Sequence, residues 1–576
     1  MKFLKFAIGL CLGLLLIAMP VQQFQPSALS SLETMTVQQD GRKKPLDTVA
    51  QETVAKIYGA TTYRHDGIQE SAMETFMSLW LNNRNWNEEP FVLVSYRPLK
   101  EIAGLDVEQK HFSFETLMRN QPLGEMVRSA HRKQIDEEDL TRDEREALTI
   151  EDRLQLMLGM VNDDAIAIVP HPTDIKGKWV GINDVQSLYD VEAAGPLLAN
   201  FAIIKQTLLS GTDHLPMLAP MTQSLRDSLA ALSPTVYPAD SIMRREVFFN
   251  HFHPFAKAWQ LYGIAFVLML VALWVQRFNL YWTAMGTFVA GVAVQSYGFW
   301  LRMQIAGRPP VTNMYESVVW VGFGIAAIAL MFELLQRSKY YLLAAAPLSM
   351  VCLILADSLP AVLDPSISPL VPVLRDNFWL SIHVPTIALS YASFALALGL
   401  GHVALGSYLF TPNAKERIKL LSQLNYRVLQ VGVLLLTAGI ILGGIWAHFS
   451  WGRFWGWDPK ETWALIALLC YLVPLHGRLV GWIGNFGISV ASVVAFNAVL
   501  MAWYGVNFVL GTGLHSYGFG TGGSELMIAS VVGLDLLFVL VTAVRHQGWL
   551  SSGLSGLGLV NKAEISPAVP SNSSSN

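Results

Sequence analysis

The chain has 576 residues, of which 52% are hydrophobic and 15% charged, with a mean hydropathy of +0.38. A soluble domain usually carries about 25% charged residues, so this composition indicates a membrane protein, and the net charge of −4 predicts no nucleic-acid partner. Cys11, Cys352 and Cys470 all lie in apolar runs and form no CxxC or CxxCH motif. This pattern argues against a disulfide framework, a thiolate zinc site and a c-type cytochrome.

The first 250 residues contain an anchor-like segment and a polar region. In residues 1–20, Lys2 and Lys5 precede an apolar run, which predicts a signal peptide or signal anchor. The anchor is favoured because no small-residue cleavage site follows at the usual distance. Residues 21–250 are polar and predict a mainly helical, water-soluble domain, with a helix over 140–160 and a strand over 165–170.

Residues 258–545 consist of successive apolar runs, each close to the roughly 20 residues that cross a bilayer. The predicted fold class is therefore an all-α polytopic membrane protein with about nine spans in this region. These spans are expected to begin near Ala258, Tyr281, Tyr315, Tyr340, Leu380, Val428, Thr462, Phe486 and Glu525. Residues 550–576 are rich in Ser, Gly, Asn and Pro and predict a disordered tail.

The positive charges of the short loops predict the orientation in the membrane. One set of loops holds Arg277, Arg337, Lys339, Lys415, Arg417, Lys419, Arg427, Arg478 and Arg545, and the alternate set holds Arg302, Arg308, Arg375, Arg453 and Lys460. The richer set is expected on the cytoplasmic side, together with Lys2 and Lys5. The soluble domain then lies outside the cytoplasm.

Tryptophans gather on one predicted external loop, which reads WAHFSWGRFWGWDPKETW over residues 446–463. It holds five of the 17 tryptophans in the chain. An interfacial aromatic belt is one interpretation, because Trp favours the headgroup level. The interleaved glycines favour a second one, in which Trp451, Trp455, Trp457 and Trp463 form a platform for a flat ligand.

The end of this loop has the pattern of a helix start. Asp458 is expected as the N-cap residue, Pro459 at the first helical position, and Glu461 as the reciprocal partner of a capping box. These residues therefore have a structural explanation and need no catalytic one.

Two histidines are expected at the same external face. His383 stands just inside the start of its span, and His515 lies on the last external loop. Either one alone is equally well explained as a hydrogen-bonded interfacial residue. Because two neutral imidazoles can ligate a haem iron from both sides, their coincidence with the tryptophans favours ligation.

His476 is expected at the other end of the membrane. It lies 14 residues after Thr462, which is about 20 Å deeper along a helix, beside Arg478. It is either a snorkelling interfacial residue or part of a second site. Nothing near His402 in the sequence suggests a ligand, and His448 has no distinct role in this interpretation.

These segments together resemble a known family. The run 451–466 is similar to the tryptophan-rich WWD signature of haem-handling proteins. With Trp379…His383, His476-Gly-Arg, Gly513-Leu-His515-Ser-Tyr517 and the loop 307–317, the chain resembles the CcsA (ResC) family of System II cytochrome c biogenesis over roughly residues 263–544. The segment 40–48 also resembles one found in extended CcsA relatives.

The resemblance implies haem b as the ligand and apocytochrome c, with its CxxCH motif, as the partner. It implies that His383 and His515 ligate haem iron at an external site, and that His476 belongs to an internal site. Arg453 or Arg308 is expected to pair with a haem propionate. The chain would then act as a component of a holocytochrome c synthase in a bacterial inner or thylakoid-type membrane.

The chain departs from fused synthetases, which carry a ResB (CcsB) half with a second intramembrane histidine. A separate ResB-like subunit is therefore expected. Three alternatives remain open: a System I haem chaperone or lyase of the CcmC or CcmF type, a transporter for another solute, and a purely structural assembly factor. The expected number of spans argues against the first, and the Trp and His pattern argues against the last.

Overall fold

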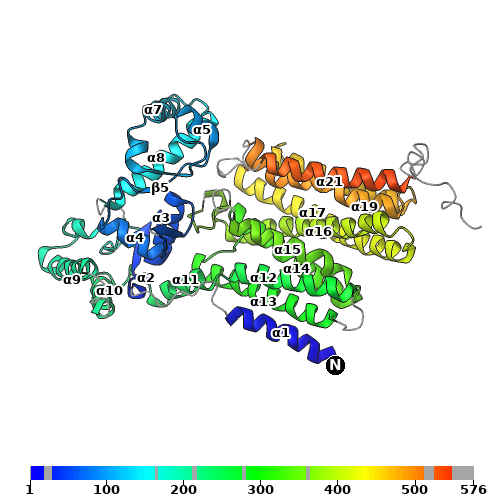
Figure 1. The fold of residues 1–576 in the computed structure, drawn as a ribbon, viewed down its shortest axis with the longest axis horizontal. Coiled ribbons are helices and arrows are strands. Elements are labelled where there is room, and N and C mark those ends of the chain that lie inside the picture. The colour runs from blue at the N-terminus through cyan, green and yellow to red at the C-terminus, as the bar shows by residue number, and fades with distance from the viewer. Residues whose placement is uncertain are drawn as a thin grey trace, which may run out of the picture.

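The computed structural model describes residues 2–18, 29–65, 67–161, 166–210, 217–274, 280–358, 363–370, 372–510, 515 and 525–547. Two parts follow one another along its longest axis (Figure 1). The N-terminal domain comprises α2 to α11, and the helical bundle comprises α1 and α12 to α21. Each part has its own hydrophobic core.

The N-terminal domain is mainly helical. Its helices are α2 (Ser30–Glu33), α3 (Leu46–Tyr58), α4 (Ala72–Leu81), α5 (Arg97–Ile102), α6 (Phe114–Met118), α7 (Gln121–Ile135), α8 (Arg142–Val161), η1 (Ile182–Ser187), α9 (Val191–Leu209), α10 (Leu218–Leu232) and α11 (Asp240–Phe252). The helix expected over 140–160 is therefore present as α8. The expected strand over 165–170 is wrong as a strand, because the described residues there form only isolated bridges at Ala167 and Val169.

Three two-stranded antiparallel sheets lie among these helices, and the sequence analysis did not identify them. They are β1 (Thr36–Gln39) with β2 (Arg42–Pro45), β3 (Thr62–His65) with β4 (Ile68–Ser71), and β5 (Pro90–Leu93) with β6 (His111–Ser113). In the first hairpin, Asp40 and Gly41 have φ angles of 51° and 74°. These are the left-handed angles that an Asp-Gly hairpin turn requires.

The bundle contains the helices predicted as spans. They are α12 (Pro254–Trp274), α13 (Tyr281–Ala306), α14 (Met314–Gln336), α15 (Tyr340–Ser358), α16 (Asn377–Phe410), α17 (Lys415–Trp451), α18 (Pro459–Leu479), α19 (Asn485–Val494), α20 (Phe496–Leu500), the π-helix η5 (Met501–Leu510) and α21 (Glu525–His546); the short helix η4 (Pro372–Arg375) precedes α16. Within the described ranges, eight helical stretches are long and apolar enough to cross a membrane. The prediction of an all-α polytopic membrane protein is confirmed.

Two helices differ from the predicted spans. α13 is not among the eight apolar stretches, because Gln295, Ser296 and Arg302 lower its hydropathy, yet it lies inside the bundle. α17 begins at Lys415, well before the predicted start at Val428. Its charged first turns still bury Ile418, Leu421 and Leu424 at helical spacing, so a polar sequence there continues the helix.

The first helix, α1 (Lys2–Ala18), packs along α13. A methyl group at Gly286 would lie 2.3 Å from the Phe6 carbonyl oxygen, and one at Gly9 would lie 2.2 Å from the Thr283 carbonyl oxygen. Such close backbone contact depends on small residues at the interface. The start of α1 lies at the end of the bundle away from the N-terminal domain (Figure 1).

The N-terminal domain is joined to the bundle by α11 and the first hairpin. The Arg42 guanidinium donates two hydrogen bonds to the buried Glu246 carboxylate of α11, at 2.9 and 2.6 Å. His253, with a φ of 47°, separates α11 from α12. This bidentate ion pair fixes α11, the helix that leads into the bundle, against the first hairpin.

A buried ion pair also organises the loops at this end of the bundle. Arg302 of α13 and Glu316 of α14 are 2.6 Å apart and 3% and 2% exposed. Arg302 also donates to the Pro365 carbonyl at 2.9 Å, and Glu316 accepts from Thr312. The loops 307–313 and 363–370 are therefore fixed beside each other.

Candidate haem-ligand site at the α17–α18 connection

The tryptophan-rich segment is less of a loop than the sequence suggests. α17 continues to Trp451 and ends at Gly452, whose φ of 71° is typical of a glycine C-cap. α18 begins at Pro459, so only residues 452–458 connect the two helices. Trp451 and Trp463 therefore stand on helices, and Trp455 and Trp457 on the connection.

The predicted capping box at the start of α18 is present. The Asp458 carboxylate accepts from the Lys460 backbone N–H at 3.0 Å, and the Glu461 carboxylate accepts from the Asp458 N–H at 3.2 Å and the Gly456 N–H at 2.8 Å. The helix start is thus fixed by three hydrogen bonds to side chains.

Asp458 has a second contact, which makes the purely structural interpretation of this residue incomplete. Its Oδ1 atom lies 3.0 Å from Nδ1 of His515, and its side chain is 3% exposed. The His515 ring also meets the Trp451 ring edge to face, with centroids 5.0 Å apart. His515 is the one residue between 511 and 524 that the structure describes, so the rest of the motif 513–517 lies outside the described residues.

His383 is held in a comparable way from the side of α16. Its Nδ1 atom lies 3.0 Å from the Gly439 carbonyl oxygen of α17, and its ring meets Trp446 at 5.6 Å between centroids. A methyl group at Gly443 would lie 2.5 Å from the ring, so glycine makes room for the imidazole. His515 and Lys460 lie close enough to His383 to interact with it electrostatically.

The tautomers of both histidines follow from these contacts. A carbonyl oxygen and a carboxylate only accept hydrogen bonds, so Nδ1 carries a proton in each ring, and in the neutral ring the lone pair is then on Nε2. Metal-ligating histidines are commonly oriented by the same kind of acceptor at their second nitrogen. Neither Nε2 atom has a hydrogen-bond partner among the residues that the structure describes.

The tryptophans do not form one flat surface. The rings of Trp455 and Trp457 are nearly perpendicular, at 88° with centroids 5.8 Å apart, and Trp457 is 68% exposed. Trp463 packs against the bundle core. The faces of these tryptophan rings therefore point in several directions.

Arg453 lies close to these rings. Its guanidinium is 5.9 Å from the Trp451 ring centroid and 4.0 Å from Glu461 Oε1. The guanidinium also lies over Gly456, so a side chain at position 456 would overlap with Arg453. Its Nη1 atom and the Trp455 Nε1 atom are buried without a hydrogen-bond partner among the described residues, so two donors remain for a ligand.

Arg308, the other arginine considered for this site, belongs to a different cluster. It donates to the Ser368 carbonyl oxygen, within the loops that Arg302 and Glu316 organise. Its electrostatic neighbours are Glu316, Arg302 and Arg42. The structure brings Arg453, and not Arg308, into contact with the tryptophan-rich segment in the part of the chain that it describes.

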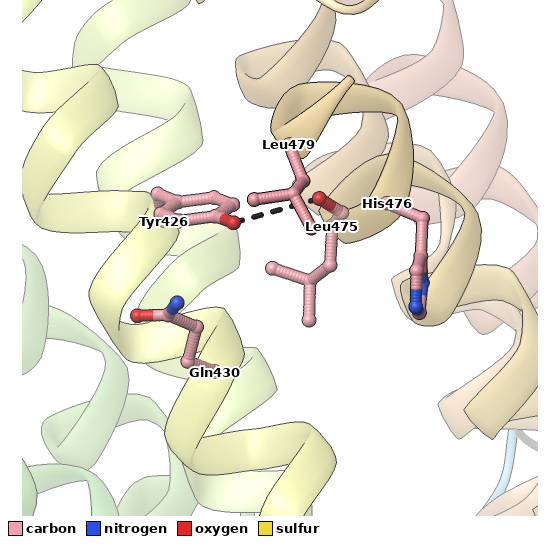
Figure 2. Close-up of a pocket in the computed structure, with 5 residues that line it drawn as sticks. All are labelled: Tyr426, Gln430, Leu475, His476 and Leu479. Carbon is pink, nitrogen blue, oxygen red and sulfur yellow. Dashed lines mark hydrogen bonds between the residues drawn. The ribbon is translucent and has the colours of Figure 1, made fainter. Parts of the chain in front are cut away.

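His476 stands apart from this site on α18. Its Nδ1 atom lies 2.9 Å from the Leu472 carbonyl oxygen, and its ring is exposed. A cavity of about 140 Å³ beside it is lined by Tyr426, Gln430, Leu475, His476 and Leu479. Figure 2 shows that these residues come from α17 and α18. Ligand pockets usually have about 300–1,000 Å³, so this cavity alone is too small for a large ligand.

The sequence analysis missed two further polar contacts inside the bundle. Lys460 Nζ donates to Asn507 of the π-helix η5 at 3.1 Å, directly beside the site. His402 Nε2 lies 2.6 Å from Asp535 of α21. Each pair joins helices far apart in sequence, and the charged residues within apolar runs were the available signal for both.

Comparison with known proteins gives these features a context. A family model described as Cytochrome C assembly protein matches residues 311–515. The protein NrfI of Wolinella succinogenes is 29% identical over 492 residues, which cover 83% of this chain and 53% of NrfI. This chain therefore spans about half the length of NrfI.

Two shorter relatives match the bundle more fully. The cytochrome c biogenesis protein CcsA of Parasynechococcus marenigrum is 37% identical over 38% of this chain and 80% of its own length. CcsA of Synechococcus sp. (strain CC9902) is 35% identical over 305 residues, which are 46% of this chain and 98% of that protein. This chain belongs to the CcsA family. The NrfI match covers 83% of the chain, so the N-terminal domain is shared in part with that relative.

Asp458 is expected to stabilise α18 as its N-cap residue. Replacing Asp458 with Ala removes the cap and should lower the free energy of unfolding by about 0.5–2 kcal/mol, whereas Asn is itself a good N-cap and should cost little. Thermal unfolding of the purified variants measures this difference. Equal destabilisation by Ala and Asn would show that the cap is not the main contribution of this residue.

Proposed function

We propose that this chain binds haem b between His383 and His515 and presents it to apocytochrome c at the outer face of the membrane. The observation that carries the proposal is the pair of imidazoles whose Nδ1 atoms are engaged by Gly439 and Asp458. Each leaves Nε2 as a potential axial ligand. Membership of the CcsA family supports the same role in cytochrome c biogenesis.

The surroundings of the two histidines suit a haem. Arg453 Nη1 has no hydrogen-bond partner among the described residues, which supports pairing with a propionate, and Trp451 and Trp455 supply aromatic surface beside it. Arg308 is no longer the favoured partner because its contacts lie with Ser368. Asp458 would orient the ligand His515 and raise its basicity through the shared proton.

The chain's own contribution would be positioning of haem and control of its iron. In the attachment step, each thiol of the CxxCH motif adds across a haem vinyl group, so that a C–S bond forms and the thiol hydrogen moves to the vinyl carbon. No group leaves, and no nucleophile from this chain is required. We place this chain as one component of a holocytochrome c synthase on that basis.

The sidedness rests on charge. The loops at the end of the bundle near α17–α18 carry fewer positive residues than those at the other end, which favours the outer face for the former. The N-terminal domain joins the bundle at the end where Arg302 and Glu316 lie, and it would therefore lie outside as well. The packing of α1 along α13 supports a retained anchor.

We further propose that a ResB-like membrane subunit completes an internal site at His476. The ring is exposed, its Nε2 atom is available, and the adjacent cavity is open and small. A second subunit covering this face of α17 and α18 would enlarge the cavity and supply a second histidine. Haem would reach the external site through this position.

External ligation is tested by replacing His383 or His515 with Gly. Each variant should purify with less haem than the wild type, and added imidazole should partly restore the Soret band by filling the vacant axial position. The exposed His448, at the end of α17, provides the matched control and should keep wild-type haem when changed to Gly. If the His383 and His515 variants retain wild-type spectra and mature cytochrome c normally, this pair is not the ligand pair.

The internal site is tested by His476→Ala, compared with Gln430→Ala in the same cavity. The histidine variant should lower haem occupancy at the external site, because less haem would reach it. The residual haem should keep the wild-type spectrum, because His383 and His515 are unchanged. Imidazole added outside intact cells should not rescue it. Normal cytochrome c maturation by His476→Ala, measured with the ResB-like subunit present, would refute the internal site.

A further inference from the structure

A second group of possible ligands lies in the N-terminal domain, outside the haem-ligand site. Glu33 of α2, Asp47 of α3 and His251 of α11 each offer one donor atom, and all three atoms lie within 4.8 Å of one another. His251 Nε2 is 3.2 Å from Asp47 Oδ1. Three elements that are remote in sequence thus direct a nitrogen and two carboxylate oxygens to one point.

The Asp47 carboxylate is rigidly held. Its side chain is 5% exposed, and it accepts hydrogen bonds from Gln51 at 3.0 Å and from Asn250 at 2.8 Å. Outer contacts of this kind orient carboxylates that bind metals. They leave the side of the carboxylate that faces His251 and Glu33 for a further positive partner.

The cluster lacks a strong cation among its described ion pairs. Among the described residues, Asp47 forms its ion pair with His251 and with no lysine or arginine. Two carboxylates this close together are costly unless a proton or a cation neutralises them.

We propose that Glu33, Asp47 and His251 bind a divalent transition-metal ion of the zinc class. Ligand atoms lie about 2.0–2.2 Å from such an ion, so the three donors need to close slightly from their present separations. His251 is 49% exposed and Glu33 is partly exposed, which permits that adjustment and leaves coordination positions for water.

The donor set selects the class of metal. One imidazole nitrogen with carboxylate oxygens suits zinc and its first-row neighbours, whereas calcium and magnesium prefer oxygen alone. Among the described residues, no cysteine sulfur belongs to this group of donor atoms. A copper(I) or iron–sulfur site is therefore disfavoured.

The position of the cluster suggests what the ion would do. α3 follows the hairpin whose Arg42 binds Glu246, and α11 leads directly into α12. A metal bound to Glu33, Asp47 and His251 would join three chain segments where the N-terminal domain meets the bundle. It would reinforce the ion pair between Arg42 and Glu246 and fix the domain relative to the membrane helices.

The test is zinc titration of the full-length, chelator-treated protein by calorimetry, with unfolding temperature as a second readout. The wild type should bind one equivalent through this cluster and unfold at a higher temperature with zinc present. Glu33→Gln and His251→Ala should each weaken that binding at least tenfold and remove the shift in unfolding temperature. His131→Ala is the matched control, because His131 pairs with the single carboxylate of Glu151 at 2.7 Å.

Glu33→Gln is expected to keep the fold, because Glu33 is partly exposed and the amide group has nearly the same shape as the carboxyl group. The control variant should bind zinc as the wild type does. Zinc binding that is absent in the wild type, or that persists unchanged in both cluster variants, would overturn the proposal. Because the readouts do not involve haem, this result is independent of the function proposed for His383 and His515.

Discussion

The buried carboxylate of Asp458 is the constraint on which the rest of the site depends. One oxygen accepts both from the first turn of α18 and from His515. The short side chain of an N-cap residue is held in place by the backbone N–H groups that donate to it. The orientation of His515, which comes from a remote part of the chain, is therefore tied to the point where α18 begins.

His383 is also held in one orientation, but by groups of α17 and not by a helix cap. A backbone carbonyl within α17 receives its Nδ1 proton, and the absence of a side chain at Gly443 admits the ring between two helices. The two rings thus depend on opposite ends of the same helix connection: α17 holds one, and the cap of α18 holds the other. Any movement of α17 against α18 would therefore change the relation between the two rings.

The features that the sequence predicted well are those with local physical causes. The spans follow from apolar length, and the capping box follows from residues two or three positions apart. The hydrogen bond between His515 and Asp458 joins residues 57 positions apart, and no local rule reaches that far. The same limit explains why the pair of His402 and Asp535 and the hydrogen bond from Arg308 to the Ser368 carbonyl were missed.

The helix ends were harder to predict than the helices because polar residues can extend a helix whose other face is packed. α17 continues over Lys415 and Arg417 for this reason, and Trp451 belongs to its last turn. The extension changed the interpretation of the tryptophan-rich segment from a long flat loop to two helix ends with a short connection. Trp463 then packs in the core, and Trp455 and Trp457 face different directions.

The central claim is that one haem iron has His383 and His515 as its two axial ligands. It is tested most directly by electron–nuclear double resonance on the ferric protein grown with isotope-labelled histidine. The account predicts a low-spin iron with hyperfine couplings to two labelled imidazole nitrogens. A spectrum with coupling to one histidine or to none would contradict it.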